Sequence, residues 1–297
     1  MTYYKALLLG ILITLTTYTV YSQDTENTSD SQETKDSLNI KDSQNKMTIW
    51  QMMKYDGASV YGGVKHVYTN PIRWKGKDWL TFGGIMAGNA ILLAVDEPAN
   101  DVFAKQGDGV PDLIKEAGFR FGKPLLNYGL TSSVYTLGLL TKNEKIRKTG
   151  VLLIASATAG GLLQTVSKTL VGRARPLTGE GNLSFKFNSS EAGFHSFPSG
   201  HAILSFTTAH AFAKQFDNLF VKGGIYALGM ITPVSRLWDG AHWLTDVTLG
   251  LVMSVVIVDS VDNYLKKDKR YVYGNKKNKI RWNLRVGANQ IGVVGRF

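Results

Sequence analysis

The sequence contains no cysteine and little proline, and it lacks a long uninterrupted apolar run. Its 297 residues include 7 prolines. The absence of cysteine excludes a disulfide framework, cysteine-ligated zinc, an iron–sulfur cluster and thiol catalysis. No stretch reaches about 18 purely apolar residues, the length that identifies a membrane span most directly. The mean hydropathy of -0.07 is also low for a chain made mostly of spans.

The residues that are present indicate a folded protein with excess positive charge. Hydrophobic residues make up 44% of the chain, which is too many for a disordered protein, and the shortage of proline argues against a fibrous one. The formal net charge of +11 indicates an anionic partner such as a membrane surface or a phosphate ester. Nucleic acid is not favoured, because much of the excess lies in a C-terminal run without a recognised nucleic-acid-binding fold.

The sequence divides into four segments. Residues 1–22 are predicted to be a cleaved signal peptide, with an uncleaved membrane anchor as the alternative. Residues 23–47 are almost wholly polar and predict a disordered tether, because they bury too little apolar surface to offset their ordering entropy. Residues 48–265 are the predicted folded domain. Residues 266–297 hold a basic tail and a predicted β-hairpin.

Six apolar stretches of helical length follow one another in the predicted domain. They contain several glycines and alanines, which allow helices to approach closely, and strand signals are few. The sequence therefore predicts an all-α fold, a helical bundle of about six principal helices. The stretches are Leu80–Val95, Tyr128–Leu140, Val151–Val166, Ala202–Phe212, Ile225–Val234 and Val247–Val261.

The first of three clusters suited to binding phosphate is basic. It contains Lys168, Arg173 and Arg175, followed by Pro176. If Pro176 ends the helix, Lys168 and Arg175 share one face two turns apart, because seven residues separate them. An ordinary basic helix end that interacts with the helix dipole would give the same pattern.

The second cluster is Pro198-Ser199-Gly200-His201, directly before an apolar helix. Ser199 is a good N-cap residue, and Gly200 allows close backbone approach. The free N–H groups of a helix start, together with the helix dipole, form an anion site beside the imidazole of His201. A simple helix cap with a surface histidine is the alternative, and the nearby His195 is interpreted as an exposed loop residue.

The third cluster contains Arg236, His242 and Asp246. His242 and Asp246 are four residues apart, which places them on one face of a helix. A hydrogen bond from His242 Nδ1 to Asp246 would fix the tautomer and leave Nε2 free as a nucleophile or base. Arg236 offers a planar fork for phosphate oxygens. Asp239 is expected to pair with a nearby cation, and a structural His–Asp pair is the alternative for the whole cluster.

Together these side chains could catalyse phosphoryl transfer through a phosphohistidine without a metal ion. His242 would attack phosphorus, and His201 would protonate the leaving oxygen. Charge on the transferred phosphoryl group would be stabilised by cations and by the helix start. The residues predicted to bind phosphate are Lys168, Arg175, Arg236, Ser199 and Gly200.

The three motifs, in this order, resemble those of the type 2 phosphatidic acid phosphatase and vanadium haloperoxidase superfamily. The resemblance covers about residues 79–261, and it implies an all-α core with His242 as the phosphorylated nucleophile. The superfamily contains both membrane-embedded lipid phosphatases and soluble exported acid phosphatases. The matching positions are Lys168, Arg175, Pro176, Pro198, Ser199, Gly200, His201, Ser235, Arg236, His242 and Asp246.

The membrane topology is contradictory at the level of sequence. A cleaved signal followed by six complete spans would place the motifs in the cytoplasm, whereas the basic residues at 142–148 and after residue 265 would place them outside by the positive-inside rule. Either the first segment is retained, one stretch does not span, or the bundle is not transmembrane. We expect an exported, membrane-associated protein of the cell envelope whose site faces the periplasm or exterior.

The expected activity is a metal-independent phosphatase acting on a lipid phosphate or diphosphate, with no cofactor, no nucleic acid and no obligate protein partner. A soluble exported acid phosphatase of broad specificity is the nearest alternative. A vanadium haloperoxidase, which would hold vanadate as cofactor, is a further alternative. From a different functional class, the chain could be a phosphate-binding or envelope-anchoring module that has lost catalysis.

Overall fold

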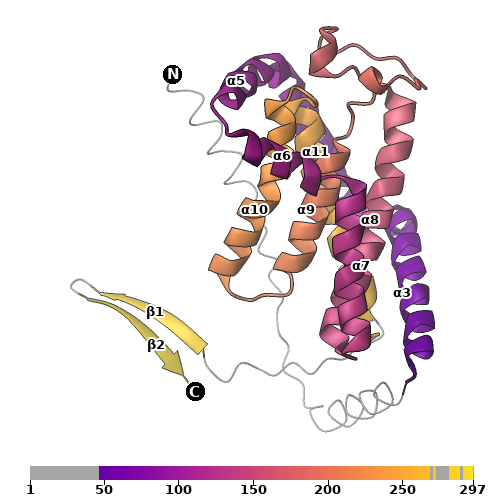
Figure 1. The fold of residues 1–297 in the computed structure, drawn as a ribbon, viewed down its shortest axis with the longest axis vertical. Helices are drawn as coiled ribbons and strands as arrows, with labels where there is room; N and C mark the ends of the chain where they lie inside the picture. Colours follow the sequence, from indigo (N-terminus) through magenta and orange to yellow (C-terminus); the bar gives the residue numbers. More distant parts are fainter. Residues whose placement is uncertain (1–46, 268–269, 272–280, 288–289, 297) are drawn as a thin grey trace. The chain divides into compact units, whose positions relative to one another are not determined.

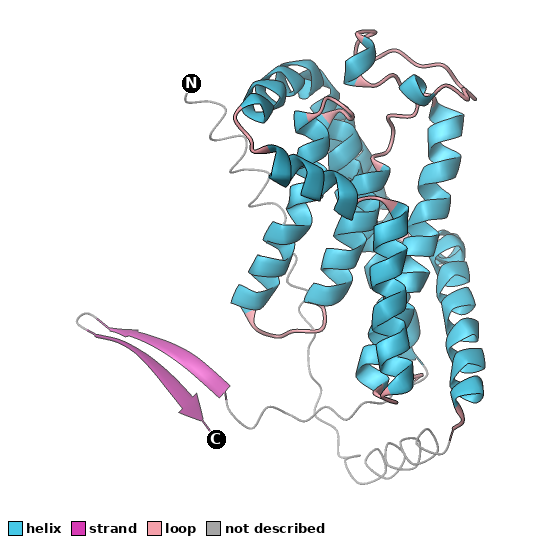
Figure 2. Ribbon diagram, in the orientation of Figure 1, coloured by secondary structure: helices cyan, strands magenta, loops and turns pink. Residues whose placement is uncertain are grey.

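The computed structural model describes residues 47–267, 270–271, 281–287 and 290–296. The predicted signal peptide at 1–22 lies outside the described residues. The same holds for the predicted tether at 23–47, apart from Met47, and for positions 268–269 and 272–280 of the basic tail. The folded part is drawn in Figure 1, with the helices and strands distinguished in Figure 2.

The chain between residues 48 and 267 is helical, which confirms the predicted all-α class. Five of the six predicted stretches lie within α7 to α11, and Leu80–Val95 lies in α4 and the 3-10 turn that follows it. The helices are α3 (Ile49–Thr69), α4 (Gly76–Leu92), α5 (Asp96–Asp108), α6 (Asp112–Phe121), α7 (Pro124–Leu140), α8 (Glu144–Val171), α9 (Gly200–Ala213), α10 (Leu219–Trp238) and α11 (Leu244–Lys266).

The prediction of about six principal helices was too low, because α3, α5 and α6 carry no continuous apolar stretch. The buried positions of α3 recur every three to four residues, as expected for one helical face. They are Met52, Asp56, Ser59 and Gly63, so half of them are polar. A search for apolar residues therefore does not detect this helix, although Thr48 caps its first turn by accepting from the N–H of Gln51.

Helix α9 lies at the centre of the bundle and packs against α8, α10 and α11. Its side chains are buried on nearly every side, which explains why the sequence reads as a continuous apolar run rather than an amphipathic one. The main apolar core lies between α8 and α11 and includes Val151, Leu152, Val258 and Val261. The ends of α8 and α10 and the beginnings of α9 and α11 meet at one end of the bundle (Figure 1).

Buried ion pairs tie the opposite end of the bundle together. Arg147 on α8 lies 3.0 Å from Asp56 on α3, and Lys148 lies 3.0 Å from Asp262 on α11. Helix α8 has 28 residues, so these pairs lie roughly 35 Å from its other end at a rise of about 1.5 Å per residue. Two of the four basic residues at 142–148 are thus committed to internal pairing.

The C-terminal segment contains two strands. β1 (Arg281–Gly287) pairs with β2 (Gln290–Arg296) in antiparallel register, with Leu284 opposite Val293. These strands occupy the region where the hairpin was predicted, and the turn residues 288–289 lie outside the described residues.

Three helical segments in the described part of the chain are long and apolar enough to cross a membrane. They are Gly76–Asp108, Glu144–Val171 and Leu244–Lys266. The first is unusual because no residue of its apolar window is buried in the fold, and Trp79, Leu80 and Phe82 are exposed on it. Six complete spans are not supported, since the other described helices do not meet both conditions.

Candidate active site

Lys168 and Arg175 do not share a helical face, so that prediction was wrong. Helix α8 ends at Val171, because Gly172 adopts a left-handed conformation with φ of 58°. A Cβ at Gly172 would lie 1.8 Å from the backbone oxygen of Lys186, so only glycine fits there. The chain turns at this point, and Arg175 lies in the extended segment before a 3-10 turn.

The two cations nevertheless converge on one backbone carbonyl. Lys168 Nζ donates to the oxygen of His195 at 2.9 Å, and Arg175 Nη2 donates to the same oxygen at 3.4 Å. The His195 ring is itself held, with Nε2 2.7 Å from the backbone oxygen of Ser189. His195 is therefore a half-buried organising residue rather than the exposed loop residue that we predicted.

Ser199 caps α9, as predicted from the sequence. Its Oγ accepts a 3.4 Å hydrogen bond from the N–H of Ala202, and its own N–H donates to the backbone oxygen of Asp246 at 3.1 Å. At Gly200, a Cβ would lie 1.7 Å from Gln164 Oε1, so glycine allows α8 and α9 to approach closely. The first turn of α9 consequently packs between the end of α8, which carries Lys168, and the start of α11, which carries Asp246.

His201 is oriented by an aromatic residue that the sequence did not reveal. Its ring stacks on Phe119 of α6, with centroids 5.4 Å apart and an interplanar angle of 13°. The same Phe119 ring lies 4.7 Å from the Arg236 guanidinium and 4.2 Å from Lys123 Nζ, distances at which cation–π attraction operates. His201 Nε2 is buried and has no hydrogen-bond partner in the described part of the chain.

His242 and Asp246 do not lie on one helical face, which corrects a second prediction. Helix α11 begins at Leu244, so His242 lies in the preceding turn, where Gly240 has φ of 57°. His242 Nδ1 is 2.7 Å from the backbone oxygen of Ser196 and 3.9 Å from Asp246 Oδ2. Because a carbonyl oxygen only accepts, Nδ1 carries the proton and Nε2 presents its lone pair.

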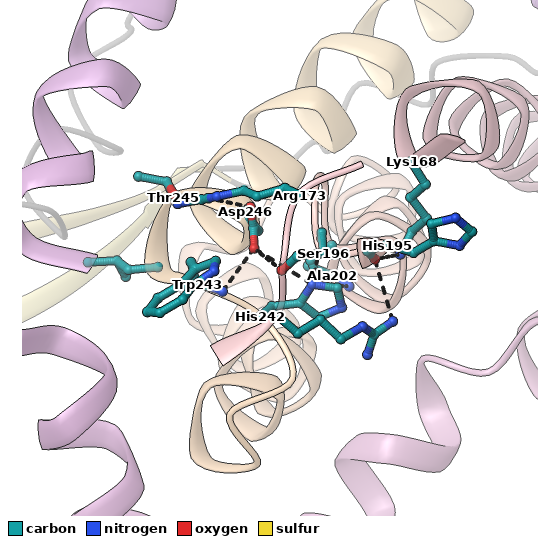
Figure 3. A network of polar contacts seen from close by, with 12 residues as sticks. Lys168, Arg173, His195, Ser196, Ala202, His242, Trp243, Thr245 and Asp246 are labelled. Atoms are coloured by element: carbon teal, nitrogen blue, oxygen red, sulfur yellow. Dashed lines mark hydrogen bonds and ion pairs between the residues drawn. The ribbon is translucent and has the colours of Figure 1, made fainter. Parts of the chain in front are cut away.

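Asp246 acts on His242 through Ser196 rather than directly. The hydroxyl of Ser196 donates to Asp246 Oδ2, while the carbonyl of the same residue accepts from His242. Asp246 Oδ2 also accepts from the N–H of Trp243 at 2.9 Å, which caps α11. Figure 3 shows Ser196 between the carboxylate and the imidazole. The predicted tautomer is therefore present, with a different acceptor.

Arg173 is part of a buried ionic network and is not a third cation facing the site. Its guanidinium is 2.6 Å from Asp246 Oδ1 and 2.7 Å from Asp96 Oδ2, and only 1% of the side chain is exposed. Asp96 also accepts from the backbone N–H of Thr245 at 2.9 Å and from its hydroxyl at 2.6 Å. This network joins the start of α5 to the start of α11 and fixes Asp246.

Arg236 lies in the last turn of α10. Its Nη2 is 2.6 Å from Asp239 Oδ2, so the predicted pairing of Asp239 with a nearby cation is confirmed. Asp239 is partly exposed, which makes this contact weak in water. Arg236 is therefore held near Phe119 and His201 without being fully neutralised by a buried carboxylate.

Electrostatics link the two histidines to the cations. Burial, followed by the positive charges of Arg236, Lys168, Arg175 and Lys123, lowers the pKa of His201 to about 4. Burial, followed by the charges of Lys168 and Arg175, lowers the pKa of His242 well below its usual value. Both histidines are neutral at pH 7, and the charges of Lys168 and Arg175 act on both of them.

This arrangement suits an oxyanion better than a metal ion. Among the described residues, no three His, Asp or Glu side chains gather closely enough to hold a metal ion. Lys168 and Arg175 form no ion pair within the same residues, and Arg175 Nε is buried without a partner. Clustered donors of this kind stabilise a tetrahedral anion, and a neutral imidazole beside them can attack it.

Comparisons with known proteins find a family model and curated relatives that are similar to the segment carrying the site. The model of the PAP2 superfamily matches residues 149–267, a segment that contains all three motifs. Lipid A 1-phosphatase of Rhizobium etli is 37% identical over 106 residues, or 34% of this chain and 44% of that protein. The same enzyme of Rhizobium johnstonii is 36% identical over 106 residues, or 34% of this chain and 42% of that protein.

Two solved structures match part of the chain. The crystal structure of Aquifex aeolicus LpxE matches with a TM-score of 0.42 and 18% identity, covering 55% of this chain and 94% of that one. A transmembrane PAP2-type phosphatidylglycerolphosphate phosphatase from Bacillus subtilis matches with a TM-score of 0.39 and 21% identity, covering 63% and 96%.

The chain spans less than half the length of the curated relatives that it matches. The matched segments nevertheless confirm the resemblance predicted from the three motifs. Residues 149–267 match the PAP2 superfamily, as the three motifs predicted.

Proposed function

We propose that the chain is a phosphatase that removes phosphate from a lipid phosphate or diphosphate through a phosphohistidine at His242. The observation that carries this proposal is the set of buried donors without an acceptor. Arg175 Nε and His201 Nε2 are both buried and unpaired in the described part of the chain. A phosphate group would satisfy these donors, and unpaired buried donors are otherwise costly.

The geometry supports a two-step transfer. His242 Nε2 attacks phosphorus, forming a P–N bond as the P–O bond to the lipid breaks, and His201 gives a proton to the departing oxygen. Water then attacks the phosphohistidine while His201 takes up a proton, which releases inorganic phosphate and restores His242. Lys168, Arg175, Arg236 and the start of α9, capped by Ser199 and including Gly200, stabilise the equatorial oxygens. Ser196 and Asp246 hold His242 in the attacking tautomer.

A lipid substrate is supported by the surroundings of the site. The curated relatives are named lipid A 1-phosphatases, and three helical segments are long enough to cross a membrane. Leu177 and Phe187, on the loop between the first two motifs, are 73% and 76% exposed. Exposed apolar side chains beside a phosphate site are well placed to contact a membrane surface.

An outward-facing site is supported by the direction of two helices. Helix α8 runs from the basic residues Lys142 and Lys145 towards Lys168, and α11 runs from Asp246 to the basic Lys266. If the basic ends lie in the cytoplasm, as the positive-inside rule favours, the site lies on the exterior or periplasmic side. We therefore propose a cell-envelope protein whose site faces outward.

The decisive test is phosphate release by purified protein in detergent with a chelator present. Substrates are a prenyl diphosphate, a lipid 1-phosphate and p-nitrophenyl phosphate, with His242→Ala as the blank. We expect release from a lipid that the blank abolishes. Better turnover of the small ester than of either lipid would favour the acid phosphatase. Activity that persists in His242→Ala would refute the mechanism, and bromide oxidation with vanadate and peroxide would identify a haloperoxidase.

A further inference from the structure

A large apolar groove lies next to the leaving-group side of the site. Its volume is about 740 Å³, within the range of small-molecule sites. It is formed by α6, α7, α9 and α10, and its lining is almost entirely carbon. Residues that define it are Gly118, Phe121, Leu126, Leu130, Leu228 and Thr232.

His201 and one of the residues that line the groove both lie beside Gly122. A Cβ at Gly122 would lie 2.5 Å from His201 Cδ2 and 2.7 Å from Thr232 Cγ2, and Thr232 lines the groove. A Cβ at Gly118 would lie 2.6 Å from Ser235 Oγ, the neighbour of Arg236. The end of the groove that is lined by Gly118 and Thr232 therefore lies beside His201.

The groove is open on the outer surface of the bundle between α7 and α10. Leu126 on α7 is 50% exposed and Leu228 on α10 is 68% exposed. The floor is close-packed, since a Cβ at Gly229 would lie 2.4 Å from the Cβ of Ala209. A flexible hydrocarbon chain could enter sideways from a membrane, lie along this floor and keep its polar end at His201.

We propose that this groove binds one hydrocarbon chain of the substrate, attached to the oxygen that leaves from His201. The inference rests on the proposed phosphatase function and goes further, because it assigns chain recognition to α6, α7, α9 and α10. Continuity with the leaving-group side favours the substrate's own chain over a second copy of this protein. Each methylene of the chain that is buried in the groove should multiply the affinity for the substrate by about four.

The test measures kcat/KM for butyl phosphate and dodecyl phosphate with the full chain in one detergent. Wild type should prefer dodecyl phosphate by more than about a hundredfold, since eight additional methylenes are buried in part. Leu126→Trp and Leu228→Trp fill the groove and should each lower the dodecyl-to-butyl ratio at least tenfold while leaving butyl phosphate within about twofold. Leu228→Ala should lower the ratio less.

Leu137→Trp is the matched control, because Leu137 lies on α7, is 54% exposed and does not line the groove. Its ratio should equal that of wild type. An unchanged ratio in both groove-filling variants, or an equal loss on both substrates, would overturn the inference. An unchanged ratio with loss of a dimer in these variants would instead assign the groove to a second copy. If wild type releases phosphate from neither ester nor the lipids, the proposed function fails and the inference fails with it.

Discussion

Binding of an oxyanion should force His201 to take up a proton. In the free protein the pKa of His201 is about 4, so only about one molecule in a thousand carries the proton at pH 7. A general acid must be protonated when the leaving oxygen departs. The bound anion must therefore raise this pKa by about three units, which corresponds to about 4 kcal/mol. A charge about 4 Å away supplies roughly this energy near a protein surface.

The expected signature is a dissociation constant that depends on pH. Sulfate is a suitable ligand because its charge does not change over the relevant range. Between the pKa of the free protein and that of the complex, sulfate affinity should fall about tenfold for each unit of rising pH. Titration calorimetry in two buffers of different ionisation enthalpy should report uptake of about one proton near pH 6. His201→Gln should abolish both effects.

The control is His66→Gln. His66 lies on α3 and stacks on Tyr264, and neither residue belongs to the candidate active site. This variant should keep the proton uptake of wild type. Sulfate affinity that is independent of pH in wild type would refute the reasoning. So would proton uptake that survives in His201→Gln, because another group would then be the one that titrates.

Three further predictions concern stability, measured by unfolding in detergent. Arg173→Met should lower the free energy of unfolding by about 3–5 kcal/mol, because it leaves two buried carboxylates without their cation. Lys186→Met should lower it by less than about 1 kcal/mol, because the pair of Lys186 with Glu191 is exposed. Equal losses in the two variants would contradict this reasoning. Gly172→Ala should destabilise by more than about 1 kcal/mol through its positive φ, while Gly57→Ala in open space on α3 should stabilise by up to about 1 kcal/mol. Stability should fall by up to about 3 kcal/mol as pH drops from 6.5 to about 4, because unfolded His201 binds a proton before folded His201 does; a His201→Gln variant with the full wild-type decline would refute this.

The structure brings the predicted motif residues close together, but it holds them in a different way from the one that the sequence predicted. The motifs fix residue types at short spacings, and the apolar stretches locate the helices that carry them. Spacing alone does not reveal where a helix begins. Gly172 ends α8 before Pro176 can do so, and α11 begins after His242, so both predictions of a shared helical face failed.

The missed residues act across long sequence separations. Asp96 is 149 positions from Thr245, and Phe119 comes from a helix with no continuous apolar run. Ser196 works partly through its backbone carbonyl, which every residue type possesses. Nothing in the sequence pattern pointed to Phe119 or Ser196.

The contacts that hold the motif residues extend beyond the segment that matches the family model. Asp96 and Phe119 both precede residue 149, where the family match begins, yet one completes the charge balance of Arg173 and the other supports the ring of His201. A fragment or graft limited to residues 149–267 would carry every motif residue and still lack these two supports. Transfer of the three motifs to another protein in their present geometry would therefore require α5 and α6 as well.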